Sequence, residues 1–115
     1  NNLLIDGKQV APNYELGVHW YEKAANQGYI QAEYKLGWAY EFGIGVVVNK
    51  ALAAYWYREA AERNHAEAQY RLGYFYSKGY GVPPNEQESR KWYIKSAKQG
   101  NRRAQQYLKL NKIKY

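Results

Sequence analysis

The chain repeats itself with a period of 36 residues, and this period limits its possible folds more than any other feature of the sequence. Residues 30–65 align with residues 66–101 without a gap and are identical at twelve positions. The same frame continues upstream, where Trp20 precedes Trp56 by one period. Periods of roughly 20–50 residues are typical of repeat proteins, in which each unit buries its apolar face against its neighbours. The sequence therefore predicts a stack of repeats.

Each repeat is predicted to contain two helices joined by a glycine-containing loop. Residues 30–42 carry apolar side chains at a spacing close to the helical period of about 3.6 residues. Gly43 suits the left-handed position that ends a helix, and Asn49 is then a natural N-cap for a second helix. Asn13 and Asn85 occupy the same place in the other repeats. We expect helices over about 14–27, 30–42, 50–63, 66–78, 86–99 and 102–113.

Two glycines fall inside the predicted helices and indicate close packing. Gly37 and Gly73 are one period apart, and each costs about 1 kcal/mol relative to alanine in a helix interior. That cost is tolerated where a bulky neighbour packs against the glycine. We expect Trp20, Trp56 and Trp92 to be these neighbours, and Trp56, at the centre of the stack, to be the most buried residue.

The first residues align with the end of a helix whose beginning is absent. Such a segment, residues 1–6, cannot bury its apolar Leu3, Leu4 and Ile5 within a complete helix pair. We therefore expect these residues to be frayed or to pack on a neighbouring molecule. The sequence contains no Met, even at position 1, so we also expect a fragment or a processed form.

A set of residues recurs at fixed spacing in both complete repeats and indicates a known family. In the first repeat the set is Leu36-Gly37, Tyr40, Gly43-Ile44-Gly45-Val46, Asn49, Trp56-Tyr57 and Ala60-Ala61. This pattern resembles the Sel-1-like repeat, a relative of the tetratricopeptide repeat. The resemblance departs from the family at Asn49, where Asp is commoner, and at Lys109, which replaces the helix glycine of the last copy.

The resemblance implies an all-α fold, a right-handed α–α superhelix (solenoid) of about six antiparallel helices. The whole chain, residues 1–115, would form one domain. We expect a partial repeat at 1–29, complete repeats at 30–65 and 66–101, and a capping helix at 102–115.

The function that the resemblance implies is binding to another protein. Members of this family are similar to scaffolds or adaptors that present a concave groove, so we expect a monomeric protein–protein interaction module. One alternative is an immunity-type protein that inhibits a cognate bacterial toxin or effector. Another is a purely structural segment of a longer repeat protein. The sequence fixes no compartment, and the resemblance favours a bacterial periplasmic or secreted location over a cytoplasmic one.

Similarity to tetratricopeptide repeats places the first helix of each pair on the concave face. Tyr and Trp there are candidates for binding because they are large, rigid and amphipathic. Trp38 and Tyr74 differ between the copies, which favours a partner role over a structural one, whereas Tyr34 and Tyr70 are identical and could belong to the core. The candidate partner-binding residues are Tyr34, Trp38, Glu41, Tyr70, Tyr74, Lys78 and Arg103.

The net charge of +7 is concentrated at the C-terminal end. Residues 87–115 hold nine Lys or Arg and one acidic residue, Glu88, whereas residues 1–86 hold eight basic and nine acidic residues. An excess of one sign favours an acidic partner, although a solvated helix face has the same pattern. Nucleic-acid binding through this end is a less favoured alternative, because few aromatic residues accompany the charges. The basic patch comprises Lys91, Lys95, Lys98 and Arg102.

Catalytic, metal and cofactor sites are not predicted. The chain has no Cys, and neither His19 nor His65 lies in a metal-binding or catalytic motif. We expect His65 to be a solvated turn residue. The glycines at 43 and 45 precede no Lys-Ser or Lys-Thr pair, so they do not form a phosphate loop. No segment approaches about 18 consecutive apolar residues, so no membrane span is expected.

Overall fold

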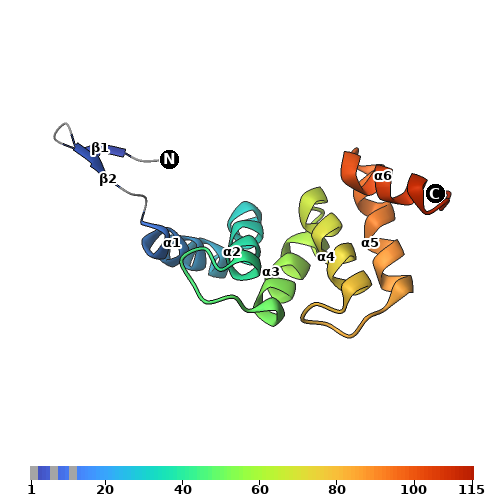
Figure 1. The fold of residues 1–115 in the computed structure, drawn as a ribbon, viewed down its shortest axis with the longest axis horizontal. Coiled ribbons are helices and arrows are strands. Elements are labelled where there is room, and N and C mark those ends of the chain that lie inside the picture. Colours follow the sequence, from blue (N-terminus) through green and yellow to red (C-terminus); the bar gives the residue numbers. More distant parts are fainter. Residues whose placement is uncertain (1–2, 6–7, 11–12) are drawn as a thin grey trace.

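Six helices and one short hairpin make up the parts of the chain that the computed structural model describes, residues 3–5, 8–10 and 13–115. The helices pack in sequence order, each against the one before and the one after (Figure 1). The molecule is accordingly elongated, with extents of 55 × 25 × 23 Å. The elements are β1 (Leu3–Ile5), β2 (Lys8–Val10), α1 (Tyr14–Asn26), α2 (Ile30–Phe42), α3 (Lys50–Glu62), α4 (Ala66–Lys78), α5 (Glu86–Lys98) and α6 (Arg102–Leu110).

The helix ends follow the predicted capping residues. The side chains of Asn13, Asn49 and Asn85 accept hydrogen bonds from backbone N–H groups three residues on, at 2.9, 3.0 and 3.1 Å. Gly43 ends α2 with a left-handed φ of 69°, a conformation that glycine adopts without steric cost. The six-helix solenoid of 36-residue repeats is therefore confirmed.

The last helix is shorter than predicted. It ends at Leu110 because Lys112 adopts a left-handed φ of 56° and the Ile113 N–H bonds back to the Leu108 carbonyl at 2.9 Å. This closure turns Ile113 onto the apolar cluster around Leu108.

At the helix glycines the core is built around tyrosine rather than the expected tryptophan, although Trp92 is itself buried. Tyr57 is completely buried, whereas Trp56 is only half-buried, so the prediction that Trp56 is the most buried residue is wrong. A Cβ on Gly37 would lie 2.7 Å from the Tyr57 ring, and one on Gly73 would lie 3.1 Å from the Tyr93 ring. The absence of a side chain at Gly37 and Gly73 thus leaves room for Tyr57 and Tyr93, the tyrosines that follow the tryptophan of each complete repeat.

The first unit exposes the face that its successors bury. Tyr21 occupies the same repeat position as Tyr57, yet it is 39% exposed. Gly17 has no atom within 4 Å of the Cβ position. Trp20 is likewise exposed, at 58%, and within the described residues α2 is the main helix that packs against α1.

The N-terminal residues form a hairpin instead of the end of a helix. β1 pairs with β2 in antiparallel register, with Leu3 opposite Val10. The helical alignment of residues 1–6 is therefore wrong for Leu3–Ile5. The sequence between the strands is Asp-Gly, a dipeptide that strongly favours hairpins. The prediction for the side chains of Leu3, Leu4 and Ile5 lies outside the described residues.

Candidate protein-binding surface

The first helices of the repeats, α2, α4 and α6, carry most of the residues predicted to bind a partner. Their exposed and half-buried side chains form what we call the first-helix surface. Gly37 on α2 and Gly73 on α4 pack against core tyrosines, and the aromatic and basic side chains on other faces of these two helices remain accessible. The surface consists of Gln31, Tyr34, Trp38, Phe42, Glu67, Tyr70, Arg71, Tyr74, Lys78 and Arg103.

Arg71 is the centre of a stack of cations and aromatic rings on this surface. Its guanidinium carbon lies 5.0 Å from the ring centre of Tyr74, 5.7 Å from that of Phe42 and 6.0 Å from that of Tyr70. The guanidinium of Arg103 covers Tyr70 at 5.7 Å. Cations within about 6 Å of a ring are attracted by its quadrupole, so these contacts join α2, α4 and α6 into one surface.

Glu41 holds the Arg71 guanidinium from the buried side and is not itself accessible. It was predicted to lie on the binding face, but it is 3% exposed, so that prediction is wrong about its exposure. The carboxylate forms a two-point ion pair with Arg71 and accepts a hydrogen bond from the Tyr57 hydroxyl at 2.7 Å. Burial lowers the pKa of Arg71, but the hydrogen bond and charge of Glu41 outweigh it and the pKa rises. The guanidinium is therefore charged and held in one orientation.

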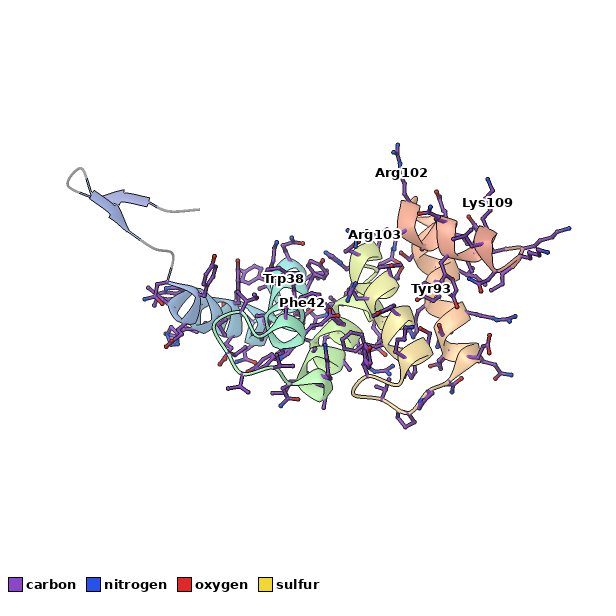
Figure 2. All side chains as sticks on the ribbon, in the orientation of Figure 1. Trp38, Phe42, Tyr93, Arg102, Arg103 and Lys109 are labelled. Atoms are coloured by element: carbon purple, nitrogen blue, oxygen red, sulfur yellow. The ribbon has the colours of Figure 1, made fainter. Side chains whose placement is uncertain are left out.

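Trp38 lies at the N-terminal edge of the first-helix surface. It is 40% exposed and meets Phe42 edge-on, with ring centres 5.8 Å apart; Figure 2 shows the two residues together on α2. Trp38 also borders an apolar cavity of about 150 Å³ between α1 and α2, lined on the α1 side by Tyr14, Val18 and Tyr21. An exposed indole beside an apolar cavity is suited to contact with a partner side chain.

Tyr34 is half-buried and is packed on His65 at the junction of two repeats. Their rings stack with centres 4.7 Å apart. His65 is not the solvated turn residue that the sequence suggested, because its Nδ1 accepts the Ala68 N–H at 3.1 Å and so caps α4. Its Nε2 then donates to the Gln31 side chain at 3.0 Å. Burial lowers the pKa of His65, with an opposing effect from Glu67, so the neutral ring is favoured.

Three of the four residues of the predicted basic patch lie on α5, outside the first-helix surface. Lys91, Lys95 and Lys98 belong to α5, and all three are exposed. Lys91 pairs with Glu88 at 2.7 Å. Arg102 extends from α6 into solvent (Figure 2). Arg103, one residue later, turns towards α4 and approaches Glu67 at 3.6 Å, so it belongs to the first-helix surface and not to the patch.

Arg71 is the important residue that the sequence analysis missed. It occupies the same repeat position as Lys35, and that shared basic character was a usable signal. Its partner Glu41 lies 30 residues earlier, a separation that helical periodicity within one segment does not reveal.

The described part of the chain offers no metal centre and no membrane helix. Across residues 3–5, 8–10 and 13–115, no group of three or more His, Cys, Asp or Glu side chains is arranged to hold a metal ion. Over the same residues, every helix is too short or too polar to cross a bilayer.

Comparison with known proteins places these repeats in a family. Residues 3–29, 30–65 and 66–101 each match the Sel1 repeat. No curated protein matches the sequence.

Several solved structures share the fold. A Sel1 repeat protein from Oxalobacter formigenes is 43% identical, with a TM-score of 0.79 over 83% of this chain and 39% of that chain. A protective antigen of uropathogenic Escherichia coli, described as having an SLR fold, is 40% identical, with a TM-score of 0.81 over 86% of this chain and 21% of that chain. Cysteine rich protein B of Helicobacter pylori is 28% identical, with a TM-score of 0.78 over 84% of this chain and 73% of that chain. This chain thus spans well under half the length of the first two proteins.

Proposed function

The chain belongs to the Sel1 repeat family, and on that basis we propose that it is a protein-binding module whose first-helix surface receives a protein partner. Sel1 repeats generally mediate protein interactions, and the fold is generally non-catalytic. The proposal therefore includes no enzymatic role and no cofactor. An immunity-type inhibitor of a toxin would be one specific form of the same activity.

The observation that carries the proposal is the stack centred on Arg71. Arg, Tyr and Trp dominate the binding energy of protein interfaces, and binding costs less when such side chains are already ordered. Here the buried Glu41 and the Tyr57 hydroxyl hold the guanidinium in place before any partner arrives. Tyr74 and Phe42 are in turn held by the guanidinium.

The basic patch supports a second part of the proposal, faster association with an acidic partner. Long-range attraction mainly raises association rates, whereas buried contacts set dissociation rates. We propose that the exposed lysines of α5 steer the partner towards the molecule and that the first-helix surface retains it. The two roles are separable because the residues lie on different helices.

The test of the first part is the dissociation rate of a partner captured with the wild-type chain and then purified. Trp38→Ala and Tyr74→Ala should each weaken binding by about 1–3 kcal/mol, mainly through faster dissociation in surface plasmon resonance. Tyr29→Ala is the matched control, since Tyr29 is 63% exposed but lies in the turn before α2. Unchanged affinity in both Trp38→Ala and Tyr74→Ala, with the helical circular dichroism intact, would place the binding site elsewhere.

The test of the second part is charge reversal at two salt concentrations. The double variant Lys95→Glu, Lys98→Glu should slow association at low salt, and the difference should vanish near 1 M salt, where the Debye length is about 3 Å. Binding that depends only on these lysines, and that falls steeply with salt while Trp38→Ala has no effect, would favour nucleic acid over a protein partner.

A further inference from the structure

A second cavity lies away from the Arg71 stack, where the turn between α1 and α2 meets α3. Its volume is about 280 Å³. The turn contributes Gln27 and Gly28, α2 contributes Glu33, and α3 contributes the half-buried Trp56 and Glu59. The turn residues belong to the first, partial repeat, whereas α2 and α3 belong to the repeat at 30–65, so this cavity lies at the junction between the first two repeats.

One wall of the cavity is a buried carboxyl group with an unused oxygen. Glu33 is 1% exposed, and its Oε1 has no hydrogen-bond partner among the described residues. The next two repeats have glutamine at this position, and the amides of Gln69 and Gln105 donate to backbone carbonyls of the preceding helix at 3.1 and 3.0 Å. An ionised carboxylate cannot donate in that way. Glu33 therefore brings acceptor capacity that the later repeats lack.

The tryptophan of the cavity differs from its repeat equivalents in what surrounds it. The ammonium of Lys23 lies 5.2 Å from the ring centre of Trp20. The ammonium of Lys95, in the same repeat position, lies 4.9 Å from that of Trp92. In the central repeat this position is Glu59, and within residues 13–115 no Lys or Arg covers the Trp56 ring.

The negative charge of the cavity is only partly balanced by its own lining residues. Arg63 also lines the cavity. Its guanidinium lies 3.4 Å from Glu33 Oε2 and also donates to the Gly28 carbonyl, and its side chain is 44% exposed. It compensates one of the two carboxylates that line the cavity. Burial raises the pKa of Glu33, Arg63 opposes this effect and Glu59 adds to it. A further positive charge would relieve the repulsion between the two carboxylates.

We propose that this cavity, the Trp56 cavity, binds an organic cation, an alkylammonium or alkylguanidinium group. Glu33 and Glu59 supply the negative charge, and the Trp56 ring receives the cation and its alkyl chain, as the rings of Trp20 and Trp92 receive lysine within the same chain. The group can come from a free amine or from a Lys or Arg side chain of a partner. This inference does not depend on the first-helix surface.

The experiment is a titration of the ¹⁵N-labelled protein with n-butylammonium chloride and, separately, n-butylguanidinium chloride. The readout is the indole N–H signal of Trp56, assigned by its absence in Trp56→Phe. Sodium chloride at the same ionic strength is the reference. We expect a saturable shift of this signal with the organic cations alone. A signal that does not move, or that moves equally with sodium chloride, would overturn the proposal.

Three substitutions and one control test the lining residues. Glu33→Gln, which introduces the residue of the later repeats, and Glu59→Gln should each weaken binding about tenfold, the effect of losing one charge contact of about 1.4 kcal/mol. Glu59→Lys should abolish binding, because the ammonium group that this change introduces would cover the Trp56 ring as the ammonium of Lys95 covers that of Trp92. Glu62→Gln makes the same charge change on the exposed end of α3 and should leave binding unchanged. An equal loss in Glu62→Gln and Glu59→Gln would show that net charge, not the cavity, attracts the cation.

The source of the cation is separated by a second pair of probes. A capped tripeptide with a central lysine is compared with the free butylammonium ion, and the same peptide with norleucine is its blank. Tighter binding of the lysine peptide assigns the cavity to a partner's side chain, and tighter binding of the free amine assigns it to a small ligand. Because Glu59 is half-exposed, Glu59→Gln keeps the test decisive even if Glu33→Gln changes the melting temperature.

Discussion

Removing the Tyr57 hydroxyl tests the packing of the central repeat with the smallest possible change. Tyr57→Phe keeps the buried ring in the space left by Gly37 and deletes only the 2.7 Å hydrogen bond to Glu41. A hydrogen bond to a charged group contributes about 1.5–3 kcal/mol. Arg71 still pairs with Glu41 in the variant, so the carboxylate keeps one partner. We therefore expect the free energy of unfolding to fall by about 2 kcal/mol.

The measurement is urea denaturation followed by far-ultraviolet circular dichroism. The midpoint should fall while the slope m is unchanged, because the surface exposed on unfolding is the same. Tyr21→Phe is the matched control. Tyr21 occupies the same repeat position but is 39% exposed, so the free energy of unfolding should fall by less than about 0.5 kcal/mol in this variant. Equal effects of Tyr57→Phe and Tyr21→Phe would show that the hydrogen bond between Tyr57 and Glu41 does not stabilise the fold.

Two further variant pairs test other parts of the structure. Gly37→Ala places a Cβ 2.7 Å from the ring of Tyr57 and should lower the free energy of unfolding by about 1–3 kcal/mol. Gly17→Ala has open space around the new Cβ and should raise the free energy of unfolding by about 0.5–1 kcal/mol. Thermal melts that give both changes the same sign would contradict this. Because the pKa of His65 is lowered in the fold, the unfolded chain binds the proton first as the pH falls below about 6.5, and stability decreases there. The drop in melting temperature between pH 7.5 and pH 5.5 should shrink in His65→Asn and persist in His19→Asn.

The sequence predicted the repeat frame and the helix caps because both depend on local chemistry. Asn49 and Gly43 act on backbone groups within a few residues, so their roles can be identified without knowing the neighbours. Trp56 and Tyr57, by contrast, are adjacent and both recur in the next repeat. They point about 100° apart around the helix, and the position of Gly37 on another helix decides which of the two rings packs against it.

The candidate surface was predicted only in part for a similar reason. The accessible aromatic residues follow helical periodicity, so the exposed Trp38 and the half-buried Tyr74 could be identified. The burial of Glu41 could not, since it depends on a cation 30 residues away and on a hydroxyl 16 residues away. Alignment with the later repeats predicts the end of a helix at Leu3–Ile5, whereas the Asp-Gly pair that follows favours a hairpin turn.

The sequential packing of the helices has a consequence for how the molecule opens. Since each helix contacts mainly its immediate neighbours in the chain, separate segments can unfold at separate free-energy costs, and amide exchange should form a gradient instead of a single global rate. Protection should be highest in α3 and α4, which lie furthest from the two ends of the stack, and lowest in α1, whose Tyr21 face is exposed. A protein bound across α2, α4 and α6 would link three of these segments, so that they would exchange together.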